Sequence, residues 1–158
     1  MMRLLRILTD LRQDREGAMI IETALVAPVL VLMSLGAFQI SSIVARQTEL
    51  QSAASEAAAI ALASPPDTAA KRTVLKNVVM ASTGLPTSKV TISVAYRCDA
   101  QASFTFQLND CNSAQVVSSF VRIRLTDTYT PAWTNFGVGS PINYNVINHV
   151  MIGQAEPT

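Results

Sequence analysis

The sequence predicts an α+β fold. A long N-terminal helix crosses a membrane, and a short helix and a small antiparallel β-sheet domain follow it. Two patterns lead to this prediction: an uncharged apolar run near the N-terminus and a period-two alternation of apolar residues in the C-terminal half. Charged residues make up only 15% of the 158 positions, below the roughly 25% that is typical of soluble domains. The apolar run, with one charged residue in 28 positions, excludes a plain soluble cytosolic domain. The net charge of +1 gives no electrostatic reason to bind nucleic acid.

The apolar run is long enough to cross a bilayer. Glu22 is the only charged residue among the 28 positions 18–45. As a helix, residues 23–45 would reach about 35 Å, against roughly 30 Å for a hydrocarbon core. Pro28 and Gly36 would weaken a soluble helix but are tolerated in a membrane. A cleaved secretory signal peptide is the rival interpretation, but its apolar region should measure only roughly 7–15 residues.

The flanking arginines predict the orientation of this helix. Arg3, Arg6, Arg12 and Arg15 precede the run, whereas only Arg46 is basic in the twenty residues after it. Because an excess of Lys and Arg marks the cytoplasmic side, we expect a cytoplasmic N-terminus and an exported C-terminal part. The leucines and isoleucine of residues 1–16 have helical spacing, so this leader is either an amphipathic helix on the inner membrane face or a disordered basic tail.

Glu22 and the residues before it carry the most specific signal. An ionisable group in an apolar segment is expensive and indicates a function by default, although Glu22 could also simply mark the membrane interface. Gly17 follows the basic leader, and Glu22 comes five residues later. This pattern resembles the processing site of type IV pilins and pseudopilins, where an inner-membrane prepilin peptidase cuts after the glycine. The resemblance implies a cut between Gly17 and Ala18.

Such a cut would give Glu22 a partner. It would create a new amine on Ala18, and Glu22 of one subunit could pair with that amine on another. A buried carboxylate paired with an ammonium costs far less than one left alone. Buried polar pairs can also fix the register between helices, so we expect Glu22 to set the axial register of an assembly.

The segment from Gly17 to residue 30 narrows the family. It reads GAMIIETALVAPVL and resembles the TadE-like family, minor pseudopilins of the tight-adherence (Tad/Flp) pilus system, whose segment reads approximately GaaavEFAlvaPvl. Thr23 departs from the aromatic residue that often follows the glutamate. The resemblance covers residues 15–45 closely. It implies a pilin-like fold and a role in assembling a Tad/Flp type IV pilus for adhesion and surface attachment. It also implies a single-pass bacterial inner-membrane protein with a periplasmic C-terminal domain. The implied partners are other Tad pilins and pseudopilins, inner-membrane platform proteins and the prepilin peptidase.

The chain is expected to divide into three parts. Residues 1–17 would form the cytoplasmic leader with the cleavage site, and residues 64–158 a periplasmic α+β domain. Between them, residues 18–63 would form one helix, transmembrane over 18–45 and periplasmic over 46–63, because consecutive prolines at 65 and 66 stop a helix. Its second half carries a stripe of alanines that indicates either close packing or helix propensity alone: Ala53, Ala54, Ala57, Ala58 and Ala61.

In the C-terminal part, the helical spacing of apolar residues predicts a second helix over 67–82, with Asp67 as its N-cap. Strands are expected after it. Apolar residues alternate with polar ones over 90–96, 103–108 and 121–126, and residues 142–152 add a last strand. This one-faced pattern favours an antiparallel sheet. Arg122 and Arg124 share one strand face, which is either solvated or meets an acidic partner surface.

Cys98 and Cys111 both lie in the exported part, where two cysteines usually pair, so a disulfide is expected. A metal site or a reactive thiol is the alternative, with the single histidine, His149, as the only further ligand. No catalytic motif is present, and we expect neither an enzyme nor a bound cofactor or metal. The alternative function is that of an uncleaved single-pass inner-membrane protein whose periplasmic domain binds a ligand or another protein.

Overall fold

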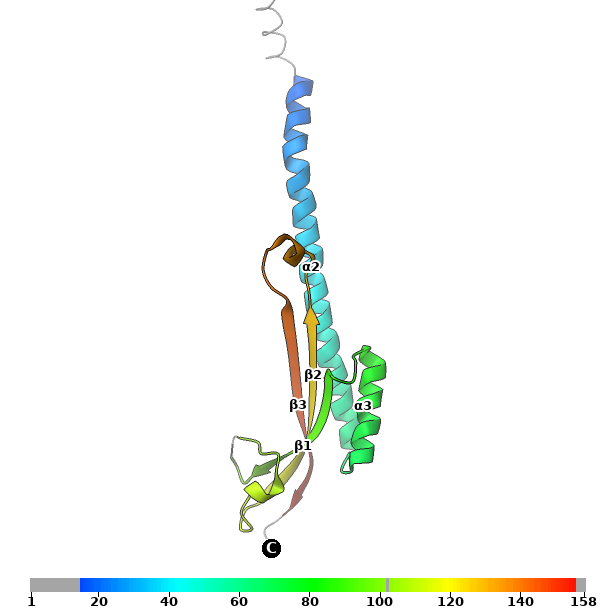
Figure 1. Ribbon diagram of the computed structural model, residues 1–158, viewed down its shortest axis with the longest axis vertical. Coiled ribbons are helices and arrows are strands. Elements are labelled where there is room, and N and C mark those ends of the chain that lie inside the picture. Colours follow the sequence, from blue (N-terminus) through cyan, green and yellow to red (C-terminus); the bar gives the residue numbers. More distant parts are fainter. Residues whose placement is uncertain (1–14, 102, 156–158) are drawn as a thin grey trace, which may run out of the picture. The chain divides into compact units, whose positions relative to one another are not determined.

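The computed structural model describes residues 15–101 and 103–155, and it confirms the α+β fold. Two helices precede a three-stranded antiparallel sheet (Figure 1). The elements are α2 (Arg15–Ala63), α3 (Ala69–Thr83), β1 (Val90–Cys98), β2 (Val117–Tyr129) and β3 (Ile142–Ala155), with the 3-10 helices η1 (Leu108–Asp110) and η2 (Ala132–Phe136). The two interpretations of the leader over 1–16 concern residues that lie almost entirely outside the described part.

The chain forms two compact units, with the boundary between Ser42 and Ile43 inside α2. In the first unit the apolar side chains of α2 are exposed; Met19 and Leu32, for example, are each 68% exposed. Among the described residues, α2 is the one helix that is long and apolar enough to cross a membrane. The first unit therefore offers an apolar surface of the kind that lipid or other apolar helices cover.

Three of the four hydroxyl side chains in residues 19–42 of α2 form hydrogen bonds within the helix; Ser41 is the fourth. Thr23, Ser34 and Ser42 each donate a hydrogen bond to the carbonyl four residues earlier, at 2.8 to 3.0 Å. In a hydrocarbon environment an unpaired hydroxyl would cost several kcal/mol, on the order of 2–7. These three side chains therefore add no unmet polar group to the apolar segment.

In the second unit, the alanine stripe of α2 packs into the core. Ala53, Ala54, Ala57 and Ala61 are buried, and Leu50 is fully buried beside them. They share one cluster with the inward-facing residues of the sheet, among them Val121, Ile123 and Leu125. Small side chains let the helix approach the sheet closely. The packing interpretation of the stripe is thus confirmed, as is the predicted inward face of β2.

The second helix starts slightly later than predicted. It spans Ala69–Thr83, and Thr68 rather than Asp67 is its N-cap, because the Thr68 hydroxyl accepts a hydrogen bond from the Lys71 N–H. Asp67 instead accepts from the Thr68 N–H and pairs with the Lys71 ammonium at 2.9 Å. Gly84 ends the helix in the left-handed conformation, with φ at 67°.

The sheet has the order β1-β2-β3, and both pairs are antiparallel. The strands run longer than their sequence patterns indicate, and a register shift interrupts the β2-β3 pair between Ser119 and Phe120. The predicted strand over 103–108 is wrong. There, only an isolated bridge joins Thr105 to Tyr96, and η1 follows.

A physical reason for that error lies in the neighbouring loop. Cys98 ends β1 and is bonded to Cys111, with 5.5 Å between their Cα atoms, so the chain must turn back within thirteen positions. The alternating apolar residues of this loop do not line a strand; Phe104 packs edge-on against Phe120 of β2. Here the alternating apolar residues belong to a loop that folds over the sheet, and not to a strand.

The disulfide leads to a stability prediction. Replacing both Cys98 and Cys111 by alanine should lower the free energy of unfolding by about 3 kcal/mol, because the unfolded chain regains the freedom that the closed loop removes. Urea unfolding of the detergent-solubilised full chain, followed by the fluorescence of the single tryptophan, measures the change. Reducing agent should lower the midpoint of the wild type and leave that of the double variant unchanged. Equal midpoints for the oxidised wild type and the double variant would contradict the prediction.

Candidate assembly and processing site

Gly17 and Ala18 lie in α2, Arg15–Ala63. Glycine is about 1 kcal/mol less favourable than alanine in a helix, so Gly17 weakens the helix at this point. An extended conformation at the peptide bond between these two residues therefore costs less than it would with alanine at position 17.

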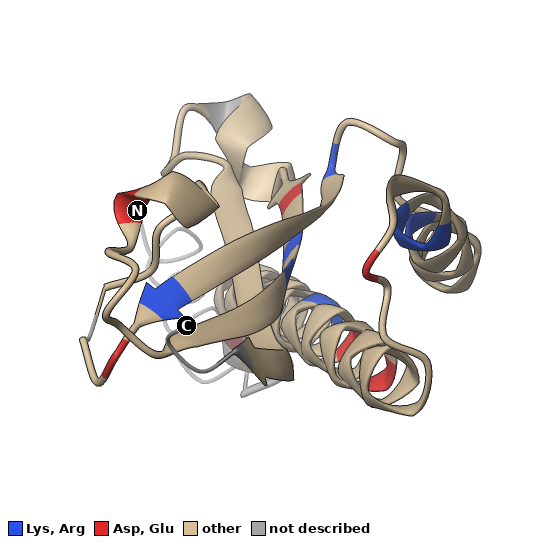
Figure 2. Ribbon diagram, turned by 90° about the horizontal axis from the view of Figure 1, so that it is seen from below, with Lys and Arg blue, Asp and Glu red and all other residues tan. Residues whose placement is uncertain are grey.

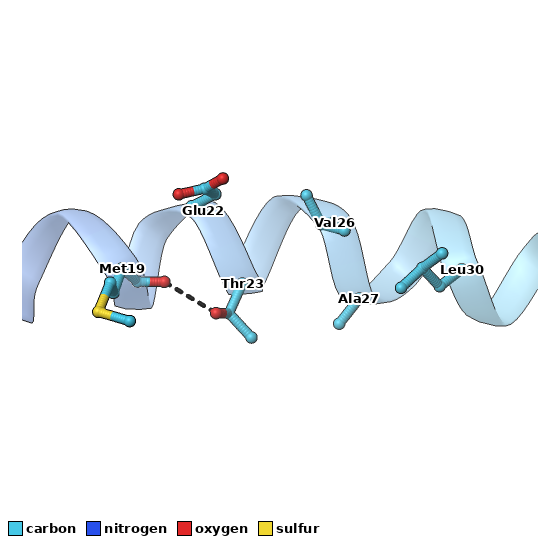
Figure 3. Close-up of a pocket in the computed structure, with 6 residues that line it drawn as sticks. All are labelled: Met19, Glu22, Thr23, Val26, Ala27 and Leu30. Atoms are coloured by element: carbon cyan, nitrogen blue, oxygen red, sulfur yellow. Dashed lines mark hydrogen bonds between the residues drawn. The ribbon is translucent and has the colours of Figure 1, made fainter.

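Glu22 is exposed on the same helix, one turn after Ala18. No hydrogen-bond or ion-pair partner for its carboxylate occurs among the described residues. Figure 3 shows the carboxylate projecting away from the helix, whereas the neighbouring Thr23 hydroxyl turns back to the Met19 carbonyl. The acid is therefore the one charged side chain that the apolar segment presents to its surroundings.

Glu22 lies on an open stretch of the α2 surface. The side chains around it are largely apolar, and all of them come from α2: Met19, Thr23, Val26, Ala27 and Leu30. Because one helix alone forms this surface, a second surface is needed to exclude water or lipid from it. An apolar helix with a cation at the level of Glu22 would complement it in both shape and charge.

Ala18 and Glu22 are four residues apart, so they share a helix face and lie about 6 Å apart along the axis. An amine on Ala18 and the Glu22 carboxylate would thus stand at the same end of one helix. The structure brings the three residues predicted from the sequence onto one short stretch of helix.

The outward face of the sheet carries a second group of side chains that the sequence analysis only partly identified. Phe104, from the disulfide-closed loop, stacks on His149 of β3, with 4.2 Å between ring centroids. The Arg122 guanidinium lies over the Phe106 ring, 5.2 Å from its centroid, while Arg124 donates to the Asn145 side chain. The expected arginine face is therefore covered at Arg122 and open at Arg124. The alternating phenylalanines were the available signal for this cover.

His149 makes the stability of this face depend on pH. Burial, and secondly the charge of Arg122, lower the pKa of His149 below its usual 6.5. As the pH falls through that value, the unfolded chain binds a proton more readily than the folded one, so folded-state stability decreases. Between about pH 7.5 and 5.5, the unfolding midpoint of the wild type should fall more steeply than that of His149→Phe, which keeps an aromatic ring against Phe104. Parallel pH profiles for the two chains would count against this role.

No group of three or more His, Cys, Asp or Glu side chains is placed to hold a metal ion in the part of the chain that the structure describes. The two cysteines are joined to each other, and His149 is stacked on a ring. The features that the sequence singles out are thus a helix terminus, an acid and an apolar surface, which suit the association of helices.

Comparison with known proteins identifies the helix that carries these features. The family described as TadE-like protein matches residues 17–59, which begin at the glycine and end within the buried half of α2. No curated protein and no solved structure shows significant similarity to the chain. The match confirms the resemblance seen in the sequence: residues 17–59 of this chain are similar to the family described as TadE-like protein.

Proposed function

We propose that the protein is a minor pseudopilin that acts in the assembly of a Tad/Flp type IV pilus, used in adhesion and surface attachment. The TadE-like match relates the chain to the Tad pilus. The observation that carries the finer assignment is the single exposed acid, Glu22, in an otherwise apolar helix surface five residues after Gly17. In this proposal a prepilin peptidase removes residues 1–17.

The mature chain would be held in the bacterial inner membrane by residues 18–45. The apolar helix is compatible with a single-pass membrane protein, and the arginines before it favour a cytoplasmic leader. Residues 46–63 and the domain 64–158 would then stand in the periplasm. An oxidising compartment suits the Cys98–Cys111 disulfide.

During assembly, α2 would leave the lipid and pack against other helices. The exposed apolar side chains of residues 19–44 would pack against other Tad pilins and pseudopilins. The Glu22 carboxylate would pair with the Ala18 amine of a neighbouring subunit, which sets the axial position of one helix against the next. Inner-membrane platform proteins would be further partners, and no step requires a cofactor or catalysis by this chain.

N-terminal sequencing of the membrane-extracted protein tests the proposal. A chain that begins at Ala18 supports a processed pseudopilin. A chain from the same host that retains Met1, with the peptidase present and active on another substrate, overturns it. That second result would instead favour an uncleaved single-pass membrane protein whose C-terminal domain binds a ligand or another protein.

A further inference from the structure

The loop that joins β2 to β3, residues 130–141, differs in composition from the rest of the second unit. From residue 128 to residue 155 the chain has no Asp, Glu, Lys or Arg. The loop contains the single tryptophan of the chain, Trp133, and Val138, which is 61% exposed. In Figure 2 the charged positions lie on other parts of the chain, among them α2, where both signs occur. The loop thus exposes an apolar side chain and carries no charge, so its transfer into a lipid headgroup layer desolvates no ionised group.

Contacts within the second unit locate this loop. The Tyr144 hydroxyl donates to the Ile43 carbonyl at 3.1 Å. One step across the sheet, Asp127 pairs with Tyr144 in the β2-β3 register and forms a salt bridge of 2.7 Å with Arg46. The base of the loop therefore lies beside residues 43–46 of α2.

The loop continues beyond these contacts. The strand pair ends at Tyr129 and Ile142, two positions past the level of Asp127 and Tyr144, and the loop starts there. Within the second unit, β2 points toward the end where α2 enters (Figure 1). Arg46 is the first charged residue after the uncharged run 23–45, so the loop lies at the level where that run ends.

We propose that the loop 130–141 rests on the lipid bilayer, in the headgroup layer of the leaflet from which α2 emerges. Tryptophan and tyrosine favour this layer because their rings have an apolar body and a polar edge. The irregular backbone of the loop sets the depth, since unpaired N–H and C=O groups are not tolerated in the hydrocarbon itself. The inference rests on α2 crossing the membrane, as the proposed function requires.

The tryptophan is held in place inside the loop. Gly139 has a left-handed backbone with φ at 72°, and a Cβ atom there would come within 3.3 Å of the Trp133 Nε1 atom. Glycine therefore lets the chain close against the indole, so the ring has a defined position. The Tyr144–Ile43 hydrogen bond holds the base of the loop beside α2. The domain would therefore contact the membrane at the loop as well as through the helix.

The single tryptophan also provides the test. The full-length chain is reconstituted into phosphatidylcholine vesicles whose lipids carry a nitroxide quencher either near the headgroup or deep in the acyl chain. We expect the headgroup label to remove most of the Trp133 emission, the deep label to remove less, and aqueous iodide to have little effect. Quenching by iodide with no quenching by either lipid label overturns the proposal.

A matched pair of variants separates the loop from general surface effects. Val138→Asp adds a charge to the loop and should reduce quenching by the headgroup label, whereas Val74→Asp, at a 63% exposed position of α3, should leave it unchanged. Protection from both iodide and lipid labels would show that a second copy covers the loop, and this outcome would also overturn the proposal. If carbonate extracts the chain from the vesicles, the membrane anchor of the proposed function fails; if the chain stays and Trp133 is not quenched, only the loop inference fails.

Discussion

Replacing Gly17 by valine is expected to abolish processing, so that the chain keeps residues 1–17 in the presence of an active prepilin peptidase. Two physical effects act together. A β-branched side chain crowds the carbonyl of the bond to be cut, where glycine leaves it open. The substitution also raises the helix propensity at this position, which stabilises the helix around the bond by about 0.3 kcal/mol. Gel mobility and N-terminal sequencing measure the fraction processed.

Gly36 offers a matched control on the same helix. A Cβ atom at Gly36 meets no other atom within 4 Å, so valine fits there without a clash. The Gly36→Val chain should therefore be processed like the wild type. Processing of Gly17→Val to a chain beginning at Ala18 would show that this glycine does not define the cleavage site.

The second large effect is expected at Glu22. Glu22→Ala should leave cleavage intact but remove the protein from the assembled pilus complex. Leaving the Ala18 amine buried without its partner costs about 3–5 kcal/mol, which corresponds to a loss of a hundredfold or more in association. Glu22→Gln should fail similarly, because it keeps the size of the side chain and loses the charge. Co-purification of the tagged chain with other pilins, together with counts of pili per cell, provides the measurement.

Thr23→Ala is the control for this experiment. The Thr23 hydroxyl bonds only to the Met19 carbonyl within its own helix, so its removal should leave assembly unchanged. A double variant tests the pairing itself. In a Gly17→Val chain, which has no free Ala18 amine, the further change Glu22→Ala should cause no additional loss of association, because the pair is already absent. Full assembly of Glu22→Ala would remove the register role.

The features predictable from the sequence were those that depend on residues close together in the chain. The apolar run, the helix end before two prolines and the buried face of β2 each follow from a local period or a breaker. The candidate site was visible for the same reason, since Gly17, Ala18 and Glu22 lie within six positions. The alanine stripe was predicted to pack, although its partners on the sheet could not be named.

The errors came from contacts between distant segments. Residues 103–108 alternate as a strand does, but the disulfide at Cys98 turns them into a loop, and Phe104 finds its partner 45 positions later at His149. No local pattern reveals such a contact. The position of the β2-β3 loop beside Ile43 depends in the same way on a hydrogen bond from Tyr144, about a hundred residues further along the chain.

The internally bonded hydroxyls of Thr23, Ser34 and Ser42 have a consequence for the direction of assembly. These hydroxyl groups bond to carbonyl groups of their own helix. Their hydrogen bonds would therefore stay the same if the helix moved from lipid into a bundle of helices. Transfer of its apolar side chains between two apolar media is close to neutral in free energy, since lipid tails are as apolar as leucine. In the proposed assembly, the preference of the helix for a bundle would therefore come from side-chain packing and from the pairing of Glu22, and not from the burial of apolar surface.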